Sequence, residues 1–378
     1  MNIIGFLVAI LIIGIIIFIH EFGHYIVAKS SGCCVSQFSI GWGPKLISFK
    51  RRETEYKISC VPLIGGYVRM AGMEAENAQL TEEEQKDIKK YNLKTFEELK
   101  TWQKFCVFVG GVGLQAVACI IILTLVIAVM GKPVNRVFVA GVSSGSAAET
   151  AGLTTGDIIL EADEEKINSV EELIDFTSDK ADKNVILTIE REKQIETLNI
   201  RPRYSQEQKR ALMGINIAPT LYFEKENMGW DDFAFGGVVF TAKMSVQIVE
   251  GIWKLITGQL SLRASAMGPV RIVAFTKEVV KTGFVQVLLF FAMININLAI
   301  INLMPFPALD GGHVLILSIE KALRIEIKPK AKEIINIVGF TLVIALMLYI
   351  TYNDVDWLIK SHFSQKQAPQ SQGHPVKK

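Results

Sequence analysis

Four long apolar runs without a charged residue constrain the fold of this chain more than any other feature of its sequence. They lie at residues 3–19, 105–130, 284–303 and 334–350. Each is close to the roughly 20 residues that a helix needs to cross the hydrocarbon core of a bilayer, the last being marginal. Half of the residues are hydrophobic, and the mean hydropathy is +0.33. The sequence therefore predicts a polytopic α-helical membrane protein with about four transmembrane helices in the lipid bilayer.

The first run has neither the basic start nor the cleavage site of a signal peptide, so we expect a retained helix that continues to about residue 28. The formal net charge is only +2, which argues against nucleic acid as a partner. Basic residues in the short loops predict the orientation, because the side that carries them is cytoplasmic and residues 132–283 then face outward. These basic residues follow the first run and precede the fourth: Lys45, Lys50, Arg51, Arg52 and Lys57, and Lys321, Arg324, Lys328, Lys330 and Lys332.

Composition and turn signals divide the chain into nine segments. We expect a first transmembrane helix (1–29), a cytoplasmic loop with a β-hairpin and a charged helix (30–104), a second transmembrane helix (105–131), a compact soluble α+β domain (135–219), an amphipathic helix and linker (220–283), a third transmembrane helix (284–312), a cytoplasmic loop (313–333), a fourth transmembrane helix (334–352) and a polar tail (353–378).

Three of the expected elements have specific signals. Residues 34–70 alternate in polarity and are rich in glycine, which favours short strands or a hairpin. Thr81 with Glu84 is typical of a capping box at the start of a solvated helix. Polar residues recur at helical spacing within 230–258, which predicts an amphipathic helix that lies at the membrane surface or covers other spans.

The strongest chemical signal is the sequence His20-Glu21-Phe22-Gly23-His24. Residues four apart lie on one face of a helix, so both imidazoles can bind one ion, and the adjacent Glu21 can act as the general base of a zinc hydrolase. The motif continues an apolar span, where such side chains are costly unless they serve a site. The alternative is a pair of core histidines bonded to neighbouring carbonyl groups.

A catalytic zinc needs a third protein ligand and an open position. We expect this ligand to be Asp310, because Pro305 and Pro307 end the third span on the same membrane side and the glycines at 311 and 312 permit a tight turn. His313 is the rival ligand. Asn297 and Asn302 are polar within an apolar span, and they either bind an extended substrate backbone or cap broken helix ends.

Taken together, these motifs resemble the site-two protease family of intramembrane zinc metalloproteases, and within it the bacterial RseP-like branch with a single PDZ domain. The resemblance covers nearly the whole chain. Its pieces occur in family order, and they are the HEFGH motif, residues 62–70, one PDZ-like domain and the segment from Asn297 to Asp310-Gly311.

The resemblance implies that His20, His24 and Asp310 hold Zn²⁺ and that Glu21 is the general base and acid. It also implies that the strand at 65–70 adds an edge to a locally unwound substrate. The residues that it implies for substrate binding are Asn297, Asn302, Pro305, Pro307, Gly65, Gly66 and Tyr67.

In the PDZ-like domain, the resemblance implies a circularly permuted form. Its carboxylate-binding loop is then Leu212-Met213-Gly214-Ile215, and residues 170–178 form the helix that lines the groove. Such a domain acts in this family as a size filter against substrates with large outer domains. The alternative is a folded spacer with no peptide in the groove.

Two stretches depart from the family pattern. Where the family commonly has Gly-Pro-x-x-Asn, this chain has Val112 and Gln115, and where it often has Ser-Gly-Pro-Val-Gly-Ile, this chain has Met267 and Arg271. We expect neither departure to touch the zinc ligands.

The resemblance implies a regulated intramembrane protease in a bacterial inner membrane, and the basic loops then predict an active site toward the cytoplasm and a PDZ-like domain in the periplasm. It would cut single-pass membrane proteins, such as anti-sigma factors or remnant signal peptides, after an upstream site-one type protease. One alternative is a catalytically silent, PDZ-bearing membrane adaptor. Another is a membrane-anchored protease whose zinc domain is soluble.

Overall fold

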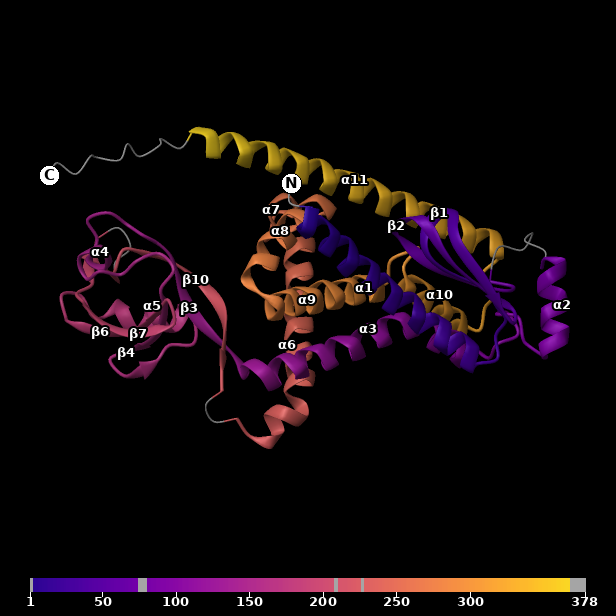
Figure 1. Cartoon of the computed structure of the whole chain (residues 1–378), viewed down its shortest axis with the longest axis horizontal. Coiled ribbons are helices and arrows are strands. Elements are labelled where there is room, and N and C mark those ends of the chain that lie inside the picture. Colours follow the sequence, from indigo (N-terminus) through magenta and orange to yellow (C-terminus); the bar gives the residue numbers. More distant parts are fainter. Residues whose placement is uncertain (1–2, 74–79, 207–209, 226–227, 368–378) are drawn as a thin grey trace. The chain divides into compact units, whose positions relative to one another are not determined.

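The computed structural model describes residues 3–73, 80–206, 210–225 and 228–367 (Figure 1). Residues 74–79 of the expected cytoplasmic loop and 368–378 of the expected tail lie outside this description. The chain forms two compact units, which are described separately below. The first unit combines Met1–Val126 with Gly237–Lys378, and the second unit is Ile127–Gly236.

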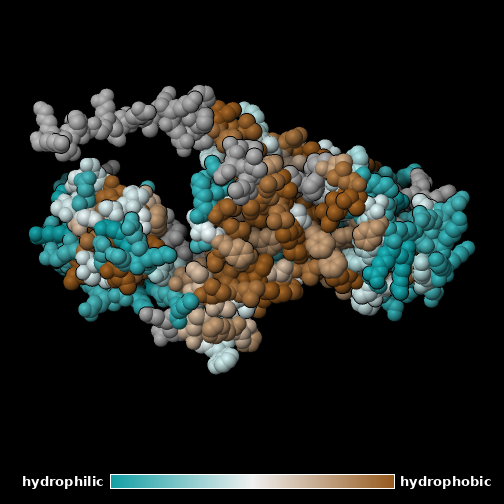
Figure 2. Space-filling view, in the orientation of Figure 1, coloured by the Kyte–Doolittle hydropathy of each residue, from teal (hydrophilic) through white to brown (hydrophobic). Residues whose placement is uncertain are grey.

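Each of the four apolar runs lies within a helix that belongs wholly or mostly to the first unit. These helices are α1 (Ile3–Ser30), α3 (Thr101–Met130), α9 (Phe284–Leu303) and α11 (Pro329–Gln367). Their surface is apolar: in Figure 2, hydrophobic side chains gather over the helices of this unit. Hydrophilic side chains gather over the β-hairpin and the neighbouring short helix. Large apolar side chains on these helices, such as Leu11, Leu125 and Leu342, are exposed, as expected for residues that face lipid.

The last helix is longer than the sequence suggested. We expected residues 353–378 to be a polar tail, but α11 continues without interruption to Gln367. The stretch 351–367 contains neither glycine nor proline, and Asn353 and Asp354 are buried against other parts of the unit. These two residues are therefore polar because they contact polar groups elsewhere in the unit, and they are not part of a solvent-exposed tail.

A fifth helix, α6 (Trp230–Ile256), is also long and apolar enough to cross a membrane by length and composition, although its hydropathy is only 1.2 against 2.3–2.8 for the other four. Its apolar face covers other spans, because Phe240, Met244 and Ile248 pack on a cluster built mainly from α3 and α9. Gly237 makes this approach possible: a Cβ there would lie 2.1 Å from Thr124 Oγ1.

The remaining helices of the first unit are short. They are α2 (Glu82–Tyr91), α7 (Leu262–Ser265), α8 (Pro269–Thr282) and α10 (Asp310–Leu323). The capping box predicted at the start of α2 is confirmed, since Thr81 and Glu84 exchange both hydrogen bonds.

The start of α8 is fixed by a carboxylate from α11. Asp354, which is fully buried, accepts hydrogen bonds from the backbone N–H groups of Gly268 (3.3 Å) and Arg271 (3.0 Å). The Arg271 Nε atom lies 3.1 Å from Asp354 Oδ1, and the guanidinium group lies over the Trp357 ring. The arginine that departs from the family pattern thus has a dedicated acidic partner.

The β-hairpin consists of two bent strands, β1 (Val35–Arg51) and β2 (Thr54–Met70). Ser39 pairs with both Tyr67 and Lys57, so the first half of β1 lies between the two halves of β2. The second half of β1 pairs on the far side, which gives the lateral order 66–70, 35–40, 54–59 and 45–51. Residues 66–70 are therefore an edge, and among the described residues no strand pairs with their outer side.

The second unit is built on an antiparallel sheet in the order β10-β3-β4-β6-β7, with β5 paired to β4. It is larger than the expected domain at 135–219, because β3 and β10 already pair at Lys132 and Glu224. Its elements are β3 (Lys132–Val142), α4 (Ala147–Thr150), β4 (Ile158–Ala162), β5 (Glu165–Lys166), α5 (Val170–Ser178), β6 (Val185–Arg191), β7 (Gln194–Ile200), β8 (Arg203–Ser205), β9 (Arg210–Leu212) and β10 (Ile215–Glu224).

An ion pair with a buried carboxylate stabilises the second unit. Asp157 is almost fully buried, and it accepts two 2.8 Å hydrogen bonds from the Arg191 guanidinium and a third from the Thr154 backbone. Burial of the Asp157 carboxyl opposes its ionisation, but these bonds outweigh that effect and hold its pKa below the ordinary value. The charged form of Asp157 is therefore part of the folded unit.

Candidate active site

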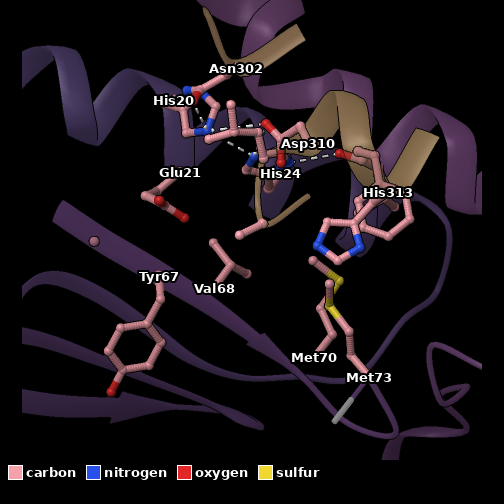
Figure 3. Close-up of a pocket in the computed structure, with 15 residues that line it drawn as sticks. His20, Glu21, His24, Tyr67, Val68, Met70, Met73, Asn302, Asp310 and His313 are labelled. Atoms are coloured by element: carbon pink, nitrogen blue, oxygen red, sulfur yellow. Dashed lines mark hydrogen bonds and ion pairs between the residues drawn. The ribbon is translucent and has the colours of Figure 1, made fainter. Parts of the chain in front are cut away.

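The two histidines of the HEFGH motif and Asp310 come together at the junction of α1 and α10 (Figure 3). The Nε2 atoms of His20 and His24 lie 3.2 Å apart, and each lies 3.3 Å from Asp310 Oδ2. His24 is buried, while His20 and Asp310 are partly buried. The structure thus joins the start of the chain to a residue far downstream.

Tight backbone contacts present Asp310 at this point. Helix α9 ends at Leu303, the chain turns through residues 304–309, and Asp310 is the first residue of α10. A Cβ on Gly311 would lie 2.2 Å from the Leu303 carbonyl oxygen, and one on Gly312 would lie 2.2 Å from the Phe306 carbonyl oxygen. The two glycines are therefore required by the closeness of the turn, as the sequence suggested.

Helix α3 fixes the orientation of both imidazole rings. The Nδ1–H of His20 donates to Gln115 Oε1 at 3.0 Å, and the Nδ1–H of His24 donates to the Val107 carbonyl at 2.7 Å. A histidine with its proton on Nδ1 presents the lone pair of Nε2. Both Nε2 lone pairs are therefore directed toward Asp310, which is the arrangement that outer hydrogen bonds give to metal-binding histidines.

Small residues allow α3 to approach α1 this closely. A Cβ on Gly23 would lie 2.2 Å from the Gly110 carbonyl oxygen, so the two backbones are in direct contact. A Cβ on Gly111 would lie 2.5 Å from His24 Nε2 and 2.8 Å from His20 Nδ1. The backbone of Gly111 thus lies directly against both imidazole rings.

These residues fit a divalent cation. The candidate ligand atoms of His20, His24 and Asp310 all lie within 4.8 Å of one another. Asp310 Oδ2 is buried and accepts no hydrogen bond in the described residues, although it is an acceptor surrounded by two more acceptors. Three such atoms repel one another unless a cation lies between them, and two imidazoles with one carboxylate are a donor set of catalytic zinc sites.

A cavity of about 270 Å³ opens beside this cluster. Glu21 lines it, and the strand edge forms the facing wall through Gly66, Tyr67 and Val68 (Figure 3). Gly66 approaches the glutamate closely: a Cβ there would lie 2.9 Å from Glu21 Cγ. The cavity therefore lies between a carboxylate that can act as a base and the edge strand of the hairpin.

The other predicted residues fall into two groups. Asn302 lines the cavity, with Nδ2 at 3.5 Å from His20 Nε2. His313 also lines it, but its ring stacks on Phe108 with centroids 4.9 Å apart and does not belong to the three-residue cluster. The remaining predicted residues of the first unit do not line the described cavity: Gly65, Asn297, Pro305 and Pro307.

Asn297 instead donates to the Met293 carbonyl of its own helix. In the second unit, the predicted loop Leu212-Met213-Gly214-Ile215 connects β9 to β10, and Gly214 has a φ of +78°. The backbone N–H of Ala148 donates to the Met213 carbonyl, which ties this loop to α4.

One expectation about the site was wrong. We expected the departures from the family pattern to leave the zinc ligands untouched, but Gln115 is the hydrogen-bond partner of His20. Sequence reasoning also missed Val107 and Gly111. A glutamine in the middle of an apolar span was the available signal, because polar groups at that depth need a partner; a backbone carbonyl such as that of Val107 gives no sequence signal.

Comparisons with known proteins identify the family to which the chain is similar. Residues 8–346 match the family described as Peptidase family M50. The chain is 29% identical to the zinc metalloprotease RasP of Oceanobacillus iheyensis, over 92% of this chain and 98% of that protein. It is 27% identical to the regulator of sigma-W protease RasP of Bacillus subtilis, over 92% of this chain and 97% of that protein. Among solved structures, the PDZ domain of the SdrC-like protein from Listeria monocytogenes matches 22% of this chain and 86% of that chain, with 24% identity and a TM-score of 0.21.

Proposed function

The chain belongs to peptidase family M50 and is a zinc metalloprotease, and from that premise we propose that it cleaves single-pass membrane proteins within their transmembrane segments. In this proposal, His20, His24 and Asp310 hold the zinc and Glu21 is the general base. The observation that carries it is the Asp310 carboxylate, 3.3 Å from both imidazole Nε2 atoms near the end of an apolar helix.

The chemistry can be followed from the residues. Zinc, when bound, acts as a Lewis acid that polarises the scissile carbonyl and makes water more acidic. Glu21 takes the proton from the attacking water and then gives it to the nitrogen of the leaving amine. Asn302, whose Nδ2 atom lies 3.5 Å from His20 Nε2, would donate a hydrogen bond to the carbonyl oxygen as it becomes negative.

The strand edge at residues 66–70 has a role in this proposal because a helical peptide bond is shielded by its own turn. A transmembrane substrate must therefore be extended locally before water can attack it. The edge lines the cavity opposite Glu21, and in the described part of the chain strand pairing is found on its inner side, so in this proposal a substrate strand adds to its outer side through main-chain hydrogen bonds.

We propose four membrane spans, α1, α3, α9 and α11, with α6 covering α3 and α9. The basic loops then place the active site on the cytoplasmic side of a bacterial inner membrane and the second unit outside. In this proposal the second unit is a PDZ-like domain that excludes substrates with intact outer domains, so an upstream protease acts first. Anti-sigma factors fit this substrate class, since one relative is named regulator of sigma-W protease RasP.

The decisive experiment separates metal binding from proton transfer. Glu21→Gln should abolish cleavage of a reporter transmembrane substrate and leave the zinc content unchanged, whereas Asp310→Ala should lose zinc. His313→Ala is the matched control, because His313 lines the cavity outside the cluster, and it should retain zinc. Cleavage by Glu21→Gln would contradict the mechanism, and zinc loss in His313→Ala but not in Asp310→Ala would reassign the third ligand.

Two further experiments address the remaining proposals. Deletion of residues 135–219 should allow cleavage of substrates with large outer domains, and unchanged selectivity would make the second unit a spacer. Cysteines placed next to the motif, at Ile19 and Tyr25, should react slowly with a membrane-impermeant thiol reagent. Rapid reaction at both positions would favour a soluble zinc domain over a site within the membrane.

A further inference from the structure

Gln115 occupies an unusual position for an amide side chain. It lies on α3 within an uninterrupted apolar run, and its exposed fraction is 0%. Its Oε1 atom accepts the His20 Nδ1–H at 3.0 Å, whereas its Nε2 atom has no hydrogen-bond partner in the part of the chain that is described. A buried amide nitrogen without an acceptor is costly, and an apolar side chain of similar size would avoid that cost.

The backbone of the same residue connects to a third helix. Asn295 on α9 is also fully buried, and its Nδ2 donates to the Gln115 carbonyl oxygen at 2.7 Å. The position of Gln115 along α3 is thus held from α9, while its side chain points to α1. A continuous set of hydrogen bonds runs from Asn295 through Gln115 to His20.

This arrangement has a chemical consequence for His20. The acceptor at Nδ1 keeps the ring proton on that atom, so Nε2 carries the lone pair that faces Asp310. His24 obtains the same effect from a backbone carbonyl, which no substitution can remove, whereas His20 depends on a side chain. Of these two acceptors, the Oε1 atom of Gln115 can be removed by a substitution, whereas the Val107 carbonyl cannot.

We propose that Gln115 is a positioning residue that fixes the tautomer and ring orientation of His20 and thereby sets the zinc affinity of the site. The inference rests on the proposed zinc site, and it assigns a specific task to one of the residues by which this chain departs from its family pattern. Any side chain that offers an acceptor oxygen at this point should serve, and an apolar side chain should not.

The test compares Gln115→Leu, Gln115→Met and Gln115→Glu in the full-length protein in detergent. Zinc affinity is measured by competition with a chelator at fixed pH, and ligand geometry is followed by the visible spectrum of the cobalt(II)-substituted protein. Loss of an outer hydrogen bond typically weakens metal binding about 10- to 100-fold, which is the expected result for Leu and Met. Glu should bind zinc within about threefold of the wild type, because its carboxylate also accepts the Nδ1–H of His20.

A residue that only fills space would give the opposite order, with Met and Leu tolerated and a buried Glu harmful. Asn295→Leu is the matched control: it removes the bond to the Gln115 backbone but keeps Oε1, so zinc affinity should change less than threefold. Unchanged zinc affinity in Leu and Met, a Glu variant as weak as Leu, or an equal loss in Asn295→Leu would each overturn the proposal. Asp310→Ala is measured in parallel to test the zinc site itself. If that variant still binds zinc, the proposed zinc site is wrong; if it loses zinc, only the role of Gln115 is in question.

Discussion

Replacement of Gly111 by alanine should eliminate the zinc site with a single methyl group. The new Cβ would lie 2.5 Å from His24 Nε2 and 2.8 Å from the Nδ1 and Cε1 atoms of His20. An ordinary contact begins at 3.4 Å, so His24 Nε2 must retreat by about 0.9 Å and the His20 ring by about 0.6 Å. Movement of helix α3 away from α1 would instead break the direct packing of its backbone at Gly110 on Gly23.

This displacement exceeds what the metal tolerates. Zinc–nitrogen bonds are about 2.0–2.1 Å long and are expected to vary by only about 0.2 Å. A misplacement of 1 Å in a catalytic group costs on the order of 100-fold in rate. We therefore expect the Gly111→Ala protein to lose most of its zinc and at least about 99% of its activity, while its helices still form.

The assay is zinc per protein by mass spectrometry of metals after gel filtration, together with cleavage of a reporter transmembrane substrate. Gly113→Ala is the matched control on the same helix, since no heavy atom lies within 4 Å of a Cβ at that position. It should keep zinc and activity, and it can gain up to about 1 kcal/mol of helix stability. Full zinc occupancy and a wild-type rate in Gly111→Ala would refute the close approach of the two helices.

Three other predictions follow from contacts described above. Gly66→Ala places a methyl group 2.9 Å from Glu21 Cγ, so the cleavage rate should fall roughly 10- to 100-fold while zinc content, measured in the same samples, stays constant. Asp157→Asn should destabilise the second unit at neutral pH: the folded pKa of this carboxyl is lowered, so its contribution is complete above the ordinary pKa of about 3.9 and is lost as the pH falls toward the folded value. Hydrogen exchange of residues 127–236 should therefore differ between variant and wild type at pH 7 and converge in acid; a constant difference would exclude the linkage. Asp354→Leu leaves the partly buried Arg271 without its acidic partner and should lower the unfolding free energy by about 3–5 kcal/mol, whereas the double variant with Arg271→Leu should recover much of that loss in a thermal unfolding assay.

The parts of the fold that the sequence predicts well are those that depend on local pattern. Apolar runs placed the helices, and the signal at Thr81 located the start of α2, because hydrophobic length and capping are properties of neighbouring residues. The end of α11 was missed since polar residues such as Asp354 suggest solvent, and only the tertiary structure reveals that this carboxylate is buried against α8.

The site shows the same division. The spacing of His20 and His24 is a helical property, so it could be read directly, and Asp310 was expected from its turn; the roles of all three stay predictions. The part played by Gln115 could not be read from the sequence, because it depends on how α3 lies against α1. Candidate ligands in a short motif can be recognised from the sequence, whereas the hydrogen-bond partners that orient them come from other helices and depend on tertiary packing.

The distance in sequence between the two halves of the metal cluster has a consequence for synthesis of the protein. His24 and Asp310 are 286 positions apart, and the whole second unit is translated between them. At about 5–20 residues per second, the ribosome needs roughly 15 to 60 s to pass from one to the other. In the proposed mechanism, the nascent chain holds during this interval a histidine pair without the carboxylate of Asp310, so the protease stays inactive until nearly all of the chain has been translated.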